Sequence, residues 1–501
     1  MKKRIKIVLS LLFAALMLAS AACSGAEKAG RTPTDPLNIA AEPGEKDQKG
    51  EAQGTQNDAQ GSEADGAEQN TQNETRETEP PICKAEAVPE NYESIREITH
   101  YIEEQVGWGD HFDLLIDMVM PKDNWGNVVY SPLSLNMLLA MISNGASDAL
   151  RSDFEAYFKS DLENYNRYFY QTYFYELSRN GQNAAARFAN AFFLRDLFEF
   201  EGGFLDKIET CYNAAHLVCP FDESFLERAN AWCAKNTDGL IEEMPSVSVD
   251  GTDGIALNAI LFNSKWATSY TDHNVRETEF RLPLYEQVVK VTGLYSTETT
   301  YLENDQAIGF MKPFAPEADG SSRYAFVGIL PKVTADDKVQ NGYDSFDPAG
   351  ENDPFDFDLS RIDFQALLET ASYEYDVDVM IPEFSYEQTI NLLPAMEAVG
   401  LGGITQDLAF PGLAVAKDNA GNTIQANFTL TYLLQKARIE VTREGVKAAA
   451  VSQAGFTGAA AVDYSEHKEV LLDRPFAFMI YDMKAQSVLF VGKVVNPTEQ
   501  N

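Results

Sequence analysis

The stretch that most constrains the fold lies near the end of the chain, between two segments that the sequence predicts to be core strands. Before it, residues 437–442 (ARIEVT) alternate, and after it, residues 475–481 (PFAFMIY) form a dense apolar run. The intervening residues 443–462 read REGVKAAAVSQAGFTGAAAV, with Phe456 as the only large apolar side chain. Its glycines argue against a stable helix. Composition alone is typical of an exposed loop.

Three details make the same stretch compatible with a buried strand. No proline occurs between Gly445 and Pro475, so every residue keeps the N–H that a central strand needs. On alternate positions from Val446 to Gly458, no side chain is charged and six of the seven are small. The lysine at 447 falls on the opposite set of positions. The segment therefore has the chemistry of both an exposed loop and a central strand.

Residues 1–22 predict a secretory signal peptide. Four basic residues precede an apolar run that is short for a membrane span and ends in small residues. Cys23 follows at once, which resembles the bacterial lipoprotein signal, in which this cysteine is lipidated; Ser20 stands where that signal usually has leucine. The alternative is an ordinary cleaved signal with an incidental cysteine. We expect a secreted protein tethered to the bacterial cell surface, or an extracellular one if the anchor is absent.

Residues 23–90 predict a disordered acidic and polar tether after Cys23. This segment has almost no aromatic residues and cannot bury enough apolar surface to offset chain entropy. The net charge of −38 disfavours nucleic acid as a partner, because nucleic-acid binding needs an excess of lysine and arginine. Residues 91–501 show no repeat and no second linker, so they predict one domain.

Within that domain, residues 127–146 predict a short strand, a Ser-Pro turn and a helix. Ser131 fits the helix cap and Pro132 fits the first helical turn. Further helices are expected at 92–106, 111–120, 204–215 and 229–244, and strands at 189–195, 255–266, 324–331 and 375–384. The strand at 255–266 is almost wholly apolar, which predicts a place in the middle of a large sheet. Residues 334–361 predict a solvated acidic loop.

The sequence offers no local signature of an enzyme, a metal site or a cofactor. The five histidines lie far apart, and the chain has no zinc-protease motif, nucleophile elbow, phosphate loop or dinucleotide fingerprint. Cys83, Cys211, Cys219 and Cys233 include no CxxC spacing. Cys211 and Cys219 are compatible with a disulfide and equally with buried free thiols.

Six short motifs, in order, resemble the serpin family over about residues 92–501. The matching positions are Asn127, Ser131, Pro132, Ser134, Gly145 and Ala146; Ala189 and Asn190; Asn258, Ala259, Phe262 and Trp266; the IPEF and NLL…AVGL segments; REGVKAAA; and the DRPFAFMIYD and GKVVNP segments. The resemblance implies an α+β fold of three β-sheets, about eight or nine helices and an exposed reactive centre loop.

The resemblance also implies an activity, that of an irreversible suicide-substrate inhibitor of serine proteases rather than an enzyme. The protease cleaves the loop and forms an acyl-enzyme, and the cut loop then inserts into the central sheet and distorts the trapped protease. Such a protein is expected to be a monomer with a metastable fold and no cofactor.

The hinge that the resemblance assigns favours an inhibitory member. It comprises Gly445, Val446, Lys447, Ala448, Ala449 and Ala450. Val446 replaces the usual threonine and Lys447 the usual glutamate, and both changes leave the inserting face uncharged. Seventeen residues counted from Arg443 end at Ala459, so the scissile bond is expected at Ala459–Ala460. An elastase-like pocket accepts alanine. A shift of the bond toward Tyr464 would indicate a chymotrypsin-like target.

The resemblance further identifies residues that control insertion. Ser131, Ser134 and Asn258 match the family's cluster beneath the sheet opening, called the shutter, and Trp266 matches the tryptophan at the top of the sheet, called the breach. The family's shutter histidine falls on Gln435, which can form hydrogen bonds but cannot titrate near neutral pH.

Three alternatives stay open at the level of the sequence. The same loop is compatible with a cysteine protease as the target. A non-inhibitory serpin would be a surface binding protein, and a solute-binding lipoprotein would need a ligand cleft and no cleavable loop. Only a loop-inserting protein should become much more heat-resistant after a single cut near residue 459.

Overall fold

The computed structural model describes residues 126–175, 185–236, 251–282, 287–317, 320–332, 362–418, 420–426, 432–446 and 466–499, with residues 239, 243 and 430. All of them belong to one compact unit, Arg76–Asn501. The predicted signal peptide, the tether, the helices at 92–106 and 111–120 and the acidic loop at 334–361 lie outside the described residues, and so does the reactive loop beyond Val446.

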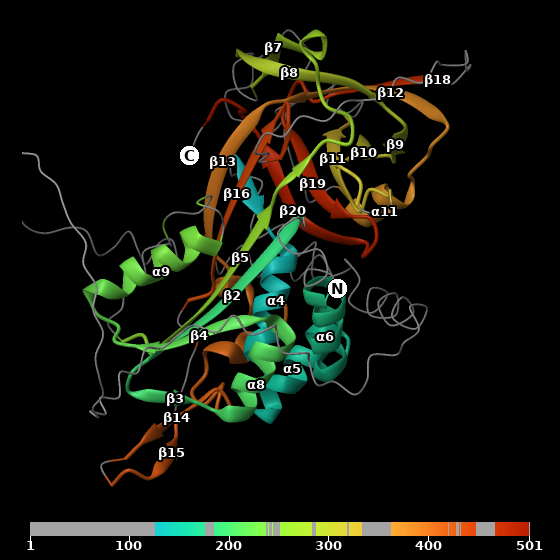
Figure 1. The fold of residues 1–501 in the computed structure, drawn as a ribbon. Coiled ribbons are helices and arrows are strands. Elements are labelled where there is room, and N and C mark those ends of the chain that lie inside the picture. The colour runs from blue at the N-terminus through green and yellow to red at the C-terminus, as the bar shows by residue number, and fades with distance from the viewer. Residues whose placement is uncertain are drawn as a thin grey trace, which may run out of the picture. The chain divides into compact units, whose positions relative to one another are not determined.

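The core is organised around a six-stranded sheet in the order β1-β20-β19-β11-β10-β9 (Figure 1). Its strands are β1 (Val128–Tyr130), β20 (Ser487–Val494), β19 (Phe476–Asp482), β11 (Tyr324–Pro331), β10 (Ala307–Pro313) and β9 (Thr300–Glu303). Phe326 and Phe478 stack across neighbouring strands with ring centres 5.9 Å apart, and both are fully buried. Continuous apolar runs suit strands that are buried on both faces.

A four-stranded sheet has the order β18-β12-β8-β7. It consists of β18 (Glu466–Leu471), β12 (Tyr375–Pro382), β8 (Val288–Glu298) and β7 (Val275–Arg281). β18, which follows the reactive loop in the chain, pairs in parallel with β12 from Tyr375↔Glu466 to Met380↔Leu471. β18 is therefore hydrogen-bonded to its sheet along its whole length.

Two further sets of strands form hydrogen-bonded ladders that are separate from each other. One has the order β4-β2-β5 and the other β13-β16-β17-β6. The strands are β4 (Ala214–Cys219), β2 (Ala186–Arg195), β5 (Gly254–Phe262), β13 (Phe384–Asn391), β16 (Leu434–Thr442), β17 (Gly445–Val446) and β6 (Ser264–Lys265). The chain runs from β5 into β6 across Asn263, which joins the two ladders at one end.

The sequence predicted that residues 255–266 form a strand in the middle of a large sheet, but β5 is paired on one side only among the described residues. β5 forms its ladder with β2 alone, from Ala186↔Phe262 to Leu194↔Gly254, and no ladder between the described residues joins β5 to β16. The two strands nonetheless lie near each other.

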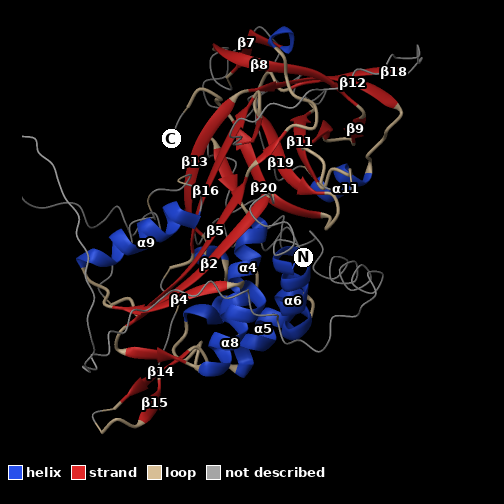
Figure 2. Cartoon of the chain, viewed as in Figure 1, coloured by secondary structure: helices blue, strands red, loops and turns tan. Residues whose placement is uncertain are grey.

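Six α-helices lie among the described residues: α4 (Pro132–Ser143), α5 (Asp148–Phe158), α6 (Leu162–Phe169), α8 (Gly202–Tyr212), α9 (Glu223–Asn236) and α11 (Phe364–Glu369). Figure 2 shows α4, α5, α6 and α8 grouped together beside β2 and β4. α9 belongs to the opposite face of that ladder, because its Phe225 and Cys233 pack with Phe193, whereas the neighbouring Phe192 belongs to the main core.

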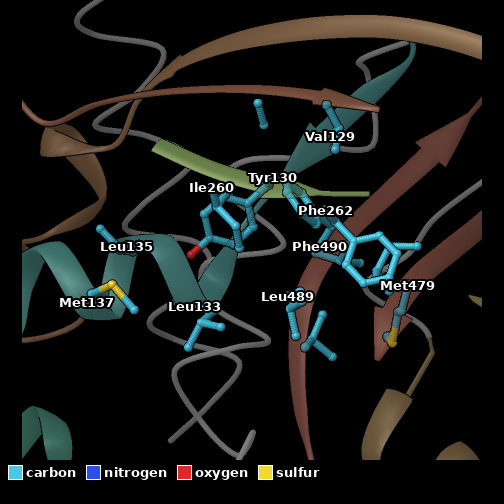
Figure 3. Close-up of a cluster of buried hydrophobic side chains, with 14 of the residues drawn as sticks. Val129, Tyr130, Leu133, Leu135, Met137, Ile260, Phe262, Met479, Leu489 and Phe490 are labelled. Atoms are coloured by element: carbon cyan, nitrogen blue, oxygen red, sulfur yellow. The ribbon is translucent and has the colours of Figure 1, made fainter. Parts of the chain in front are cut away.

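α4 shows how the sequence fixes a buried helix. Ser131 is its N-cap and accepts a hydrogen bond from the Ser134 N–H, and Pro132 stands in the first turn, as predicted. The helix is apolar nearly all round, and eleven of its twelve residues are buried. Figure 3 shows Leu133, Leu135 and Met137 of α4 in the same cluster as Tyr130 of β1 and Ile260 of β5.

Several predicted boundaries need correction. The helix expected at 204–215 ends at Tyr212, because Asn213 adopts a left-handed conformation and Ala214 begins β4, a strand the sequence did not predict. The helix at 229–244 starts earlier and is α9. The strand at 375–384 is two strands, β12 and β13, separated at Glu383. A small additional sheet, β15-β14-β3 (Thr423–Gln425, Ala414–Lys417, Phe198–Phe200), was not predicted.

Candidate functional site: the hinge and the sheet opening

The start of the reactive loop already forms a strand. β16 ends at Thr442, the chain turns, and β17 returns antiparallel to it with Val441 paired to Val446. On its other side β17 pairs antiparallel with β6, where Val446 lies opposite Ser264. Gly445 and Val446 are thus hydrogen-bonded on both sides, as residues of a central strand. Val446 is 2% exposed, so the first side chain of the inserting face points into the core.

Glycine is required at the first position of β17. Gly445 has φ of +150°, and a Cβ placed there would collide with the Ser264 carbonyl oxygen and lie 2.7 Å from the Lys265 Cα. Backbone atoms of a paired strand cannot move aside as a flexible side chain can. Any other residue would have to displace β6 or leave the strand.

Four hydrogen bonds connect the turn between β16 and β17 to residues outside it. The Arg443 N–H donates to Glu383 Oε1 at 2.9 Å, and the Arg443 guanidinium lies 2.7 Å from Asp272 Oδ1. The Trp266 N–H donates to the Glu444 carbonyl at 3.3 Å, and the indole Nε1–H donates to the Thr442 carbonyl at 2.9 Å. These bonds hold the turn against Glu383, Asp272 and Trp266.

Trp266 connects the turn to the interior. Its indole stacks on Phe314 with ring centres 4.9 Å apart and meets Tyr270 and Phe326 edge-on. Trp266 is 2% exposed. Burial raises the pKa of Tyr270 well above its usual value, so its phenol stays protonated at any physiological pH.

A second cluster lies along the opening between β5 and β16. Gln435 of β16 forms two hydrogen bonds with one residue: its Oε1 accepts from the Ser131 N–H at 2.7 Å and its Nε2 donates to the Ser131 carbonyl at 2.8 Å. The Ser131 hydroxyl donates to the Leu489 carbonyl of β20 at 2.6 Å. Gln435 is 5% exposed and Ser131 fully buried, so these bonds are shielded from water.

The cluster continues across β5 and β2. The Ser134 hydroxyl donates to Asn258 Oδ1, and Asn258 Nδ2 donates to Asn190 Oδ1 at 2.6 Å. Asn190 Nδ2 in turn donates to the carbonyl of Tyr212, the last residue of α8, at 2.8 Å. A chain of neutral side chains thus runs from β16 through the start of α4 to β5 and β2. Separating β5 from β16 has to break or rearrange this chain.

The structure brings the predicted site residues together in two groups. Ser131, Ser134, Asn258 and Gln435 form the hydrogen-bonded chain, and Gly445, Val446 and Trp266 form the hinge. The remaining predicted positions, namely Lys447, Ala448, Ala449, Ala450, Ala459, Ala460, Tyr464 and Cys23, lie outside the described residues.

Sequence reasoning missed residues that complete both groups. Asn190 was named only as a position that matches the family, and the signal for a role at the site was a polar side chain beside the apolar run 191–194. Asp272 and Glu383 carried no such signal, because acidic residues are abundant in this chain and their proximity to Arg443 depends on the tertiary fold.

Three of the five cysteines lie among the described residues. Cys211, Cys219 and Cys233 are buried, and no disulfide joins Cys211 to Cys219. In the described ranges no cluster of His, Cys, Asp and Glu could hold a metal ion. None of the helices in those ranges is long and apolar enough to cross a membrane.

Gly445 and Val446, paired between β16 and β6, lie at the start of the segment that the sequence resemblance assigned to the reactive loop. Residues 112–497 match the family "Serpin (serine protease inhibitor)". The chain therefore belongs to the serpin family. Members of this family are generally protease inhibitors and not enzymes. In general terms, this protein is therefore a serpin-type protease inhibitor.

Similar proteins occur across distant organisms. A serpin-like protein of Thermococcus kodakarensis is 24% identical over 394 residues, covering 77% of this chain and 84% of the relative. Human Serpin B4 is 24% identical over 415 residues, covering 77% and 97%. The native-state crystal structure of the thermophilic serpin tengpin is 27% identical with a TM-score of 0.62, covering 79% of this chain and 94% of tengpin.

Proposed function

We propose that this protein is an irreversible inhibitor of elastase-like serine proteases that acts by cleavage of its reactive loop at Ala459–Ala460. The cut loop would then extend β17 as a new strand between β5 and β16. The observation that carries the proposal is the pairing of Gly445 and Val446 with β16 on one side and β6 on the other. Insertion would continue a strand that is already started, in a register that is already set.

Ladder hydrogen bonds would contribute to the driving force for insertion. Adding about 12 residues to the sheet creates about as many ladder hydrogen bonds, which at about 1 kcal/mol each contribute on the order of 10 kcal/mol before ordering costs. That is comparable to the whole stability of a domain. The native fold would then be a kinetically trapped state.

The sequence beyond β17 suits a buried strand. Side chains alternate faces along a strand, and Val446 faces the core. The next positions of the same parity are Ala448, Ala450, Ser452 and Ala454, all small and uncharged. A strand with this face can enter between β5 and β16 without a clash and without burying a charge.

The test is to mix the full-length protein with pancreatic elastase and analyse the mixture on a denaturing gel with intact-mass measurement. We expect a stable covalent adduct and a C-terminal peptide that starts at Ala460. As a matched variant, Ala459→Arg should lose the elastase adduct and form one with trypsin, because a trypsin-like pocket accepts arginine. Cleavage by elastase without any adduct would contradict the proposal, and an adduct with a cysteine protease alone would redirect it.

We further propose that the inhibitor is tethered to the bacterial cell surface through a lipid on Cys23. The support is the basic and apolar start followed at once by cysteine, and the long polar segment up to residue 90. Expression with a radiolabelled fatty acid should label the wild type, and Cys23→Ala should abolish labelling and release the protein into the medium. Equal labelling of both forms would contradict the anchor.

A further inference from the structure

A buried cation lies beneath the hinge. Lys312 of β10 is 2% exposed, and its Nζ is 2.6 Å from Glu298 Oε1 of β8 and 3.3 Å from the Ser296 hydroxyl. The Ser296 hydroxyl donates to the same Glu298 oxygen at 2.6 Å. A buried ion pair is a weak source of stability, because the loss of hydration offsets much of the attraction between the charges. The burial of the Lys312–Glu298 pair therefore needs a reason other than its contribution to stability.

The pair lies against the tryptophan that holds the hinge turn. Lys312 Nζ is 5.5 Å from the centre of the Trp266 ring and 4.6 Å from that of Tyr270, within the range of cation–π attraction. The Trp266 indole N–H donates to the Thr442 carbonyl, at the end of β16. Lys312 is thus separated from the hinge turn by a single side chain.

We infer that Lys312 and Glu298 are positioning residues, which hold the Trp266 indole in the orientation that keeps Gly445 and Val446 docked between β16 and β6. Glu298 fixes the ammonium, the ammonium fixes the indole, and the indole fixes the Thr442 carbonyl. The consequence for protease trapping rests on the proposed function, whereas the docking of the hinge does not. With a loose indole, β17 separates and insertion has to start without a set register, so more acyl-enzyme hydrolyses before the loop inserts.

Hydrogen exchange of the full-length protein tests the docking directly. In Lys312→Met the backbone amides of residues 444–446 should exchange at least tenfold faster than in the wild type. The matched control is Lys332→Met, which removes a lysine of an exposed pair, 2.6 Å from Glu303 with side chains 33% and 43% exposed. The control should stay within twofold of the wild type at residues 444–446.

A second variant separates positioning from stability. Lys312→Met leaves Glu298 buried without its partner and can destabilise the whole fold for that reason. The double variant Lys312→Met/Glu298→Leu removes both charges and keeps the interior filled. We expect a melting temperature within a few degrees of the wild type together with the same fast exchange at residues 444–446. Recovery of slow exchange in the double variant would overturn the inference, since the pair would then act through stability alone.

Protease trapping provides the functional readout. With a protease that the wild type traps, the double variant should release at least threefold more cleaved, untrapped inhibitor per adduct formed. If the wild type traps no serine protease, the proposed function fails, and the exchange experiment still decides the role of the pair. Unchanged exchange in both variants would overturn the inference whatever the trapping yield.

Discussion

A Cβ on Gly445 would lie 2.7 Å from the Cα of Lys265, closer than a side-chain carbon can approach backbone in a folded protein. The first residue of the loop strand is therefore confined to the smallest side chain by the strand it pairs with. β17 and β6 therefore fit together only when position 445 has no Cβ. A substitution at this position can test whether the pairing of β17 with β6 matters.

Gly445→Ala should expel β17 from its place between β16 and β6. The added methyl group collides with β6, and φ of +150° is unfavourable for alanine. We expect the fraction of inhibitor that is cleaved but not trapped to rise at least fivefold, measured on denaturing gels. The control is Gly202→Ala, where an added Cβ meets nothing within 4 Å. Trapping equal to that of the wild type would show that the docked hinge has no part in insertion.

Gln435→Leu should destabilise the protein by about 3 kcal/mol. It leaves the buried Ser131 N–H without its acceptor, at a cost of about 1–3 kcal/mol, and removes one of two hydrogen bonds to the Ser131 carbonyl, which keeps the bond from the Leu135 N–H. The measurement is the free energy of unfolding from urea titrations. Gln425→Leu, on the exposed strand β15, is the control and should change stability by about 0.5 kcal/mol or less. An equal effect of the two substitutions would contradict the claim that the hydrogen bonds between Gln435 and Ser131 stabilise the fold.

Gln435→His should introduce a pH dependence that the wild type lacks at this position. A neutral imidazole can accept from the Ser131 N–H and donate to its carbonyl, but an imidazolium cannot accept. Folding would then depress the histidine pKa below its unfolded value of about 6.5, so stability present above that pH is lost as the pH falls. The melting temperature of the variant relative to the wild type should be lower at pH 5.5 than at pH 7.5. A constant difference would contradict the geometry.

Cys233 should be unreactive in the folded protein. Burial raises the pKa of its thiol to about 12, and only the thiolate is alkylated. Because the folded pKa exceeds the unfolded one, the associated stability is present at neutral pH and is lost as the pH rises toward 12. Iodoacetamide at pH 8.5 should label Cys233 at least a hundredfold more slowly in the folded than in the urea-unfolded protein, by peptide mass spectrometry. Comparable rates would place Cys233 at the surface.

Much of the local structure could be predicted from the sequence. The Ser-Pro turn at Ser131 and Pro132 specifies the start of α4, because the hydroxyl caps the helix and proline suits its first turn. The apolar run at 324–331 has the same bounds as β11. The alternation in 437–442 predicted the buried face of β16, where Ile439 and Val441 are both buried.

Other features depend on tertiary contacts that a sequence pattern does not contain. β4 has four exposed side chains at its centre and therefore no alternating buried face, so its strand conformation comes from pairing with β2. That β5 has no ladder with β16 among the described residues could not be foreseen, because an apolar strand looks the same whether it is paired on one side or on both. Lys312 and Glu298 lie 14 positions apart in different sheets, and only the fold brings them together.

The most direct test of the central claim is the stability of the cut protein. A metalloprotease such as thermolysin, which forms no acyl-enzyme, can cut the loop between Lys447 and Ser465 without being trapped. If the cut loop extends β17, the melting temperature of the cleaved protein should exceed that of the intact protein by about 10 °C, the shift that a gain on the order of 10 kcal/mol produces in a domain of about 400 residues. A cleaved protein that melts at or below the temperature of the intact one would contradict loop insertion.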